Sequence, residues 1–439
     1  MKHLLINYCD ARIEPNALQT AQKRLENVQQ QIKKLSHHEM NDSLSFVNLP
    51  GNETYKKQVQ EVINQKKKLK PTVLIVIGIG GSNLGTAAIV QALLGTMYNE
   101  LQPDCRIYFA DTVDDDYIYD LILLVEQELE KNNTVLINII SKSGSTTETV
   151  ANGALFIELL KKACPKNYQE YIVVTTDKDS SLWQIGKENN FTCLEIPLGV
   201  GGRYSVLTAV GLFPLGMISI DIDQLCAGAH QMTQLCLDTD PEKNPATQLA
   251  TVLAHHVHHE IFIHDTFVFS VDLKGLGLWY RQLLAESLGK EFTIDGKAIK
   301  HSLVPTVSVG SIDLHSTGQL TLSGTESVVT TFVTVEHNNN NLTVPRIAHL
   351  GLLEDSIKGK TLHALMQAIY DGTMHAYKQR KLPFVSITLP EKNAWYIGQW
   401  LQCHMIAIVY LGCLLDINPF GQPNVELYKQ KTREILANE

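Results

Sequence analysis

Short apolar runs rich in β-branched residues alternate with helical patterns along most of the chain. From about residue 71 these runs cover 73–77, 106–110, 134–140, 171–176 and 192–196. A strand that is buried on both faces reads as one continuous apolar run, and strands that alternate with helices build βαβ units. The first half of the chain is therefore predicted to form a parallel sheet with helices on both faces.

A second series of the same kind begins near residue 266. Its apolar runs cover 266–271, 305–309, 328–335 and 384–389, and its helical patterns cover 276–289, 361–380 and 394–412. Between the two series the polar segment 238–244 (DTDPEKN) interrupts the pattern, and residues 1–45 are polar with sparse apolar positions that read as helices.

These patterns predict an α/β protein with four parts. The expected parts are an N-terminal helical arm (1–45), a first αβα domain (46–230), a second αβα domain (231–425) and a C-terminal helix (426–439).

The composition excludes several classes of protein. With 439 residues, 44% of them hydrophobic, the chain can bury a large core, and a net charge of −9 argues against nucleic-acid binding. The eight cysteines are scattered without a CxxC pair, and the N-terminus lacks the pattern of a signal peptide. The apolar run 405–415 is too short to span a membrane. A cytoplasmic protein with reduced thiols and no membrane or nucleic-acid partner is expected.

The first candidate site is the segment 73–85 (VLIVIGIGGSNLG), an apolar run that ends in closely spaced glycines. Glycine allows a close backbone approach to a ligand, and the helix that follows offers unpaired N–H groups to an anion. Asn83 stands where a G-x-G-x-x-G fingerprint would place its third glycine, although Asp111 after the next strand could imitate a ribose-binding acid. A dinucleotide-binding oxidoreductase is therefore the lesser interpretation.

The second candidate site is the segment 141–149 (SKSGSTTET), which directly follows an apolar run. Ser145 and Glu148 match the S-x-x-E capping box at the start of a helix. A cap needs one hydroxyl, so the other hydroxyls remain available to an anion. Two such loops favour a phosphate site over a merely well-capped helix.

Further segments carry catalytic residue types. Arg203 stands among glycines in 199–205 (GVGGRYS), where it could lie close to a small anionic intermediate. In 279–291 (WYRQLLAESLGKE), Gln282 and Glu286 share one helical face, with leucines on the other. His315 lies in a polar loop or helix start, and Lys429 lies in the C-terminal helix. Taken singly, each has an ordinary alternative as a turn, a surface or a structural residue.

One histidine pair has metal-like spacing. His255 and His259 are four residues apart in 253–260 (LAHHVHHE), but the Glu follows the histidines, so the segment is not an HExxH motif. Without an identifiable third ligand, surface or core histidines are the favoured interpretation, and no metal or other cofactor is predicted.

Six segments in this order resemble the glucose-6-phosphate isomerase family in its shorter bacterial form. They are GIGGSNLG, SKSGSTTET, GGRYS, QLLAESLGKE, the HSTGQ segment and NPFGQPNVELYK, and the likeness runs from about residue 45 to the end. The resemblance implies two sugar-isomerase-type (SIS) αβα sandwiches with parallel sheets, and a homodimer.

The resemblance also implies a role for individual residues. Glu286 matches the base that moves the proton between C1 and C2, Arg203 the residue that stabilises the enediolate, and His315 and Lys429 the pair that assists ring opening. The residues implied to hold the sugar phosphate are Gly81, Ser82, Ser141, the backbone of Lys142, Ser143, Thr146, Gln282 and Gln422. His315 would reach into the neighbouring subunit's site.

Two positions depart from the family's usual NPFDQPGVE. Gly421 replaces Asp and Asn424 replaces Gly, which changes the backbone freedom of that loop. The activity implied is the reversible isomerisation of glucose 6-phosphate to fructose 6-phosphate. The alternative is a non-catalytic sugar-phosphate-binding SIS module, which would need the hydroxyl loops but not Glu286, Arg203, His315 and Lys429 together.

Overall fold

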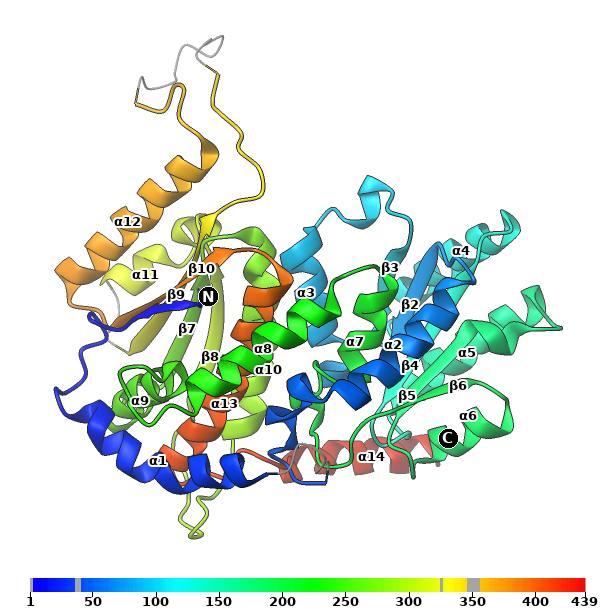
Figure 1. Ribbon diagram of the computed structural model, residues 1–439, viewed down its shortest axis with the longest axis horizontal. Helices are drawn as coiled ribbons and strands as arrows, with labels where there is room; N and C mark the ends of the chain where they lie inside the picture. The colour runs from blue at the N-terminus through cyan, green and yellow to red at the C-terminus, as the bar shows by residue number, and fades with distance from the viewer. Residues whose placement is uncertain (1–2, 36–40, 324–326, 346–355, 439) are drawn as a thin grey trace.

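The computed structural model describes residues 3–35, 41–323, 327–345 and 356–438. Within them, two five-stranded sheets lie in different parts of the molecule, and helices fill the space between the sheets and cover their outer faces (Figure 1). The predicted α/β class, with two sheets covered by helices, is confirmed.

The first sheet is parallel throughout, in the order β3-β2-β4-β5-β6. Its strands are β2 (Val73–Ile77), β3 (Arg106–Ala110), β4 (Val135–Ser141), β5 (Ile172–Thr176) and β6 (Thr192–Glu195). The helices of this half are α2 (Glu53–Lys67), α3 (Leu84–Leu94), α4 (Asp115–Glu130), α5 (Thr147–Ala163), α6 (Ser181–Glu188) and α7 (Ala209–Met217). These strands match the sequence-based prediction to within one residue at each end.

Strand β2 explains why this sheet needs helices on both faces. Val73, Ile75 and Ile77 pack into one core cluster with residues of α4 and α5, whereas Leu74 and Val76 pack into another with residues of α3 and α7. Successive side chains of a strand point to opposite faces, so a strand without polar positions must be covered twice.

The second sheet has the order β1-β10-β9-β7-β8. Its strands are β1 (Leu5–Asn7), β7 (Ile263–Val268), β8 (Val304–Val309), β9 (Val328–His337) and β10 (Phe384–Glu391). The helices of this half are α8 (Ile222–Cys236), α9 (Pro245–His258), α10 (Lys274–Leu288), α11 (Gly318–Ser323), α12 (Leu362–Arg380) and α13 (Ala394–Leu414). Strand β7 begins and ends three residues before the predicted run 266–271.

Two details of this sheet differ from the sequence-based prediction. The N-terminal arm is not purely helical, because β1 precedes its helix α1 (Ala17–Lys34) and pairs with β10. That pairing is antiparallel, so the second sheet is not entirely parallel. A three-residue edge strand is too short to produce a periodic pattern, and the pairing is fixed by tertiary contact with β10.

Helix α13 lies in the interior between the sheets. It is long and apolar enough to cross a membrane, but 94% of its apolar window is buried within the protein. It packs against α8, a continuous helix that contains the predicted domain boundary at 230/231. The C-terminal helix α14 (Glu426–Leu436) then extends toward the part of the molecule that holds the first sheet (Figure 1).

Candidate active site

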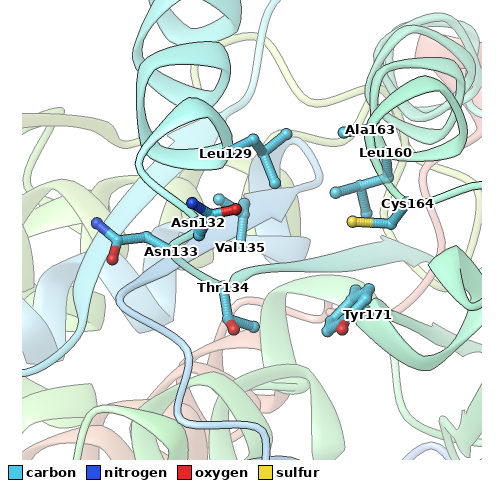
Figure 2. Close-up of a pocket in the computed structure, with 9 residues that line it drawn as sticks. All are labelled: Leu129, Asn132, Asn133, Thr134, Val135, Leu160, Ala163, Cys164 and Tyr171. Carbon is cyan, nitrogen blue, oxygen red and sulfur yellow. The ribbon is translucent and has the colours of Figure 1, made fainter.

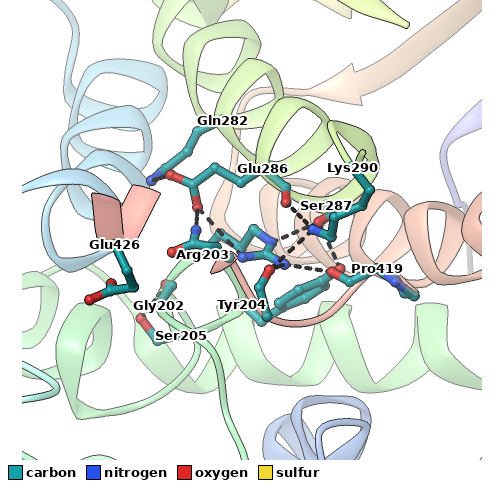
Figure 3. A network of polar contacts seen from close by, with 12 residues as sticks. Gly202, Arg203, Tyr204, Ser205, Gln282, Glu286, Ser287, Lys290, Pro419 and Glu426 are labelled. Carbon is teal, nitrogen blue, oxygen red and sulfur yellow. Dashed lines mark hydrogen bonds and ion pairs between the residues drawn. The ribbon is translucent and has the colours of Figure 1, made fainter. Parts of the chain in front are cut away.

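The carboxylate of Glu286 is the centre of a polar cluster near the end of α10 (Figure 3). Gln282 Nε2 donates to Glu286 Oε1 at 2.9 Å, and the amide of Gln422 donates to Oε2. Arg203 Nη1 lies 3.6 Å from Oε2, and the Glu286 side chain is 31% exposed. A partly accessible carboxylate held by two amides and a guanidinium is thus fixed in orientation while remaining open to a ligand.

The local sequence explains how α10 presents this carboxylate. Gln282 and Glu286 are one turn apart on the same face, whereas Leu283, Leu284 and Leu288 point away from that face and are buried at 1% exposure or less. The predicted helical spacing of the pair is confirmed.

Arg203 is held rigidly beside Glu286. Its side chain is 5% exposed, and its Nε donates to Ser287 Oγ at 2.7 Å. Its Nη2 donates to the carbonyl of Pro419 at 2.5 Å and to that of Gly421 at 3.4 Å. These contacts satisfy one edge of the guanidinium and leave Nη1 facing the carboxylate.

The glycine turn after β2 lies directly against this cluster. A Cβ on Gly81 would stand 2.2 Å from the carbonyl carbon of Gly202, which precedes Arg203. Gly80 has φ +61°, and a Cβ there would stand 2.9 Å from Gln282 Nε2. The backbones at Gly81 and Gly202 are too close for a side chain on Gly81, which explains why glycine occurs at that position.

The hydroxyl loop after β4 differs from the prediction in its cap. Helix α5 begins at Thr147 with Thr146 as its N-cap, and no side-chain capping bond is found there among the described residues. The predicted Ser145–Glu148 capping box is therefore wrong. Ser145 Oγ bonds to Ser143 Oγ at 3.2 Å, because the loop turns through Gly144 at φ +72° before the helix starts.

The remaining hydroxyls line the start of α5. Ser141 Oγ and Thr146 Oγ1 are 3.0 Å apart, and the N–H of Gly144 donates to Ser141 Oγ at 3.1 Å. Backbone N–H groups and hydroxyls are thus gathered at the positive end of a 17-residue helix, an arrangement suited to an anion.

Lys142 connects this loop with the segment that leads to Arg203. Its Nζ donates to the carbonyls of Leu198 at 2.8 Å and Val200 at 2.9 Å. Burial lowers the pKa of Lys142, and the nearby charge of Asp177 partly opposes that effect.

The structure does not gather every predicted residue around Glu286. His315 is exposed in a short 3₁₀ turn directly after β8, and Lys429 lies on α14, where its Nζ pairs with Glu426 at 2.8 Å. Helix α10 connects the parallel strands β7 and β8, so it runs back from their carboxyl ends toward their amino ends. Glu286 therefore lies near the amino end of β8 and His315 near its carboxyl end, at opposite ends of the strand.

Sequence reasoning missed two contributors to the site. Ser287 is buried and accepts from Arg203, and Lys290 donates to the backbone of Glu286 at 2.6 Å. Both residues lie within the QLLAESLGKE motif, but their positions in the sequence do not reveal which groups they hydrogen-bond. Asp111, considered as a ribose-binding acid, instead accepts from Asn83 at 2.8 Å and braces the glycine turn.

Two further features lie outside the cluster around Glu286. Among the described residues no group of three or more His, Cys, Asp or Glu is placed to hold a metal, and the rings of His255 and His259 stack with centroids 4.2 Å apart.

A cavity of about 180 Å³ lies at the amino end of β4 (Figure 2). It is lined by Leu129, Asn132, Asn133, Thr134, Val135, Leu160, Ala163, Cys164 and Tyr171.

A family model described as phosphoglucose isomerase matches residues 61–439. The chain belongs to the phosphoglucose isomerase family. Membership of this family confirms the predicted activity, the interconversion of glucose 6-phosphate and fructose 6-phosphate. The substrate is therefore a sugar phosphate.

Individual relatives agree with membership of the phosphoglucose isomerase family. A glucose-6-phosphate isomerase of Symbiobacterium thermophilum is 36% identical over 83% of this chain and 80% of its own length. One from Carboxydothermus hydrogenoformans is 33% identical over 83% of this chain and 79% of its own length.

Solved structures agree in fold. A hypothetical protein from Thermus thermophilus has a TM-score of 0.88 at 29% identity, covering 99% of this chain and 100% of its own. A glucose-6-phosphate isomerase from Chlamydia trachomatis has a TM-score of 0.83 at 20% identity, covering 100% of this chain and 89% of its own. The second likeness supports the fold alone.

Proposed function

We propose that Glu286 is the base of this isomerase and that Arg203 stabilises the enediolate. The observation that carries the proposal is the convergence of two amides and a buried guanidinium on one partly exposed carboxylate. Glu286 takes the C2 proton of the open aldose, which leaves an enediolate, and returns the proton to C1. A positioned base of this kind contributes about 10²–10⁴-fold to the rate.

The position of Arg203 supports its role. Its Nε and Nη2 are engaged by Ser287 and backbone carbonyls, so the guanidinium does not need to reorganise during the reaction. Its Nη1 faces the carboxylate across 3.6 Å, beside the position where C1 and C2 would lie. Preorganised charge at a developing oxyanion is commonly the largest catalytic contribution.

The phosphate is assigned to the two loops at the carboxyl ends of β2 and β4. Ser141, Ser143 and Thr146 would donate hydroxyls, and the backbone of Lys142 would lie alongside. Ser82 and Gly81 would complete the site from the glycine turn. The phosphate takes no part in the chemistry, but its binding energy orients C1 and C2 against Glu286.

Gln282 and Gln422 would line the sugar. In the described part of the chain, Gln282 Oε1 is buried without a hydrogen-bond partner. A buried acceptor left without a donor is costly, and a substrate hydroxyl would satisfy it.

The ring-opening residues support a homodimeric enzyme. His315 and Lys429 would move protons to and from the ring oxygen and the anomeric hydroxyl, with the division of labour open. Because His315 and Glu286 lie at opposite ends of β8, His315 would serve the site of a partner subunit. The family assignment favours this enzyme over a non-catalytic sugar-phosphate module, and the eight free thiols fit a cytoplasmic location.

Replacement of the base tests the chemistry. Glu286→Gln should abolish isomerisation in an assay coupled to fructose 6-phosphate while sugar-phosphate binding largely survives, because the phosphate loops are untouched. Glu158→Gln, on the exposed face of α5, is the matched control and should keep wild-type activity. Activity of Glu286→Gln within tenfold of wild type would refute the assignment.

Mixing two inactive chains tests the shared site. A random mixture of Glu286→Gln and His315→Ala chains should recover about one quarter of the wild-type sites, since half the dimers are mixed and each has one intact pair. No recovery after subunit exchange would mean that His315 acts within its own chain.

A further inference from the structure

Lys290 follows Glu286 by one helical turn and lies just beyond the end of α10 (Figure 3). Its Nζ donates to the carbonyl of Glu286 at 2.6 Å and to the carbonyl of Gly421 at 3.1 Å. The first carbonyl is one of the last four of the helix, which have no partner inside it. The second belongs to the C-terminal segment 419–422, more than a hundred residues away in sequence.

These bonds close a ring of contacts around the base. Gly421 is followed by Gln422, whose amide donates to the carboxylate of Glu286, while the carbonyl of Gly421 also accepts from Arg203 Nη2. Lys290 therefore joins the backbone of Glu286 to the segment that carries Gln422 and anchors Arg203.

The charge of Lys290 is costly at this position. Burial, followed by the charge of Arg203, lowers its pKa to about 8, and the charge of Glu286 partly opposes the shift. The segment 419–422 accepts from Lys290 through the carbonyl of Gly421 and carries no titratable side chain. Burying an ammonium beside a second cation costs free energy unless hydrogen bonds compensate for the lost hydration. The two backbone carbonyls supply those bonds here, which a neutral apolar side chain could not form.

We infer that Lys290 is a positioning residue, which fastens the 419–422 segment to α10 and thereby keeps Gln422 and Arg203 aligned with Glu286. This rests on the proposed roles of Glu286 and Arg203. It assigns Lys290 no contact with the substrate.

The variants Lys290→Met and Lys290→Arg test this role. Lys290→Met keeps the length of the side chain but removes its donors, so kcat should fall at least tenfold while KM stays within about threefold. Lys290→Arg keeps charge and donors and should recover part of the loss. Lys274→Met, an exposed lysine at the other end of α10, is the matched control.

Two further readouts separate positioning from a general loss of stability. Wild-type kcat should fall as the pH rises past about 8, where Lys290 loses its proton. That fall should be missing in Lys290→Arg, because arginine does not lose its proton there. Adding Gln422→Ala to Lys290→Met should cost less than the product of the two single effects, because both act on the same alignment.

Backbone hydrogen exchange keeps the inference testable apart from catalysis. Peptides covering 419–425 should exchange faster in Lys290→Met than in wild type, with exchange in the first sheet unchanged. If Glu286→Gln kept its activity, the proposed roles of Glu286 and Arg203 would fall, while this exchange measurement would still judge Lys290. Unchanged exchange there, or kcat of Lys290→Met within twofold of wild type, would overturn the positioning role.

Discussion

A single methyl group on Gly81 should separate the two halves of the active site. The added Cβ would stand 2.2 Å from the carbonyl carbon of Gly202, 2.3 Å from its oxygen and 2.7 Å from the N atom of Arg203. Ordinary contact begins at 3.4 Å, so the two backbones must move apart by about 1.2 Å. All three clashing atoms are backbone, and none can be relieved by a side-chain rotation.

The displacement acts on Arg203, the residue that faces the proposed base. Arg203 would shift relative to Glu286, which now lies 3.6 Å from Nη1. A misplacement of about 1 Å typically costs on the order of 10²-fold in rate, or about 2.7 kcal/mol of barrier. Overpacking should cost a further 1–3 kcal/mol, roughly, in the free energy of unfolding.

Steady-state kinetics and thermal unfolding of Gly81→Ala check this prediction. We expect kcat to fall about a hundredfold in protein that is still folded at the assay temperature. Gly372→Ala makes the same change on the exposed face of α12, where an added Cβ meets nothing within 4 Å, and should leave kcat unchanged. A kcat for Gly81→Ala within threefold of wild type would refute the argument from close approach.

Three further predictions follow from the contacts of the site and the core. Lys142→Met removes both hydrogen bonds between the hydroxyl loop and the segment before Arg203, so KM for the sugar phosphate should rise several-fold. An unchanged KM would show that these bonds do not support substrate binding. Gly421→Asp restores the family's usual residue at φ +73°, where a Cβ meets nothing within 4 Å, so we expect a melting temperature lower by a few degrees at most and kcat within threefold. Burial lowers the pKa of His264 to about 3 and of His404 to about 4 from an ordinary 6.5, so the unfolded chain binds more protons below pH 6.5. As the pH falls from 6.5 to 4, the free energy of unfolding should therefore fall by about 1.4 kcal/mol per pH unit for each histidine. His404→Asn should make the melting temperature depend less on pH over that range.

Much of the fold could be predicted because its strands are buried on both faces. Val73–Ile77 has the predicted bounds, since a parallel strand that is buried at every position between two helical layers has no polar residue to confuse the pattern. Strand β1 could not be predicted, because three residues have no period and their pairing depends on β10, nearly four hundred residues away.

The site was predictable where local spacing determines geometry. Gln282 and Glu286 share a face because they are four apart in a helix, and the structure adds the hydrogen bond between them. The cap of α5 was not predictable, because the backbone at Gly144 turns before Ser145 can reach the helix. Lys290 was missed for a different reason: its partner Gly421 comes near only through the packing of the C-terminal segment.

The charges around Glu286 are arranged for a reaction in which negative charge moves a short way and returns. Before proton abstraction the charge is on the carboxylate, 3.6 Å from Arg203 Nη1. When the proposed base takes the C2 proton, that charge disappears from Glu286 and reappears on the enediolate oxygen. Because Arg203 is fixed by Ser287 and the carbonyl of Pro419, it would remain beside both positions without moving. Under the proposed roles, the attraction to the guanidinium would then be transferred from the carboxylate to the intermediate rather than lost, and the fixed arginine would stabilise the charge throughout the proton transfer.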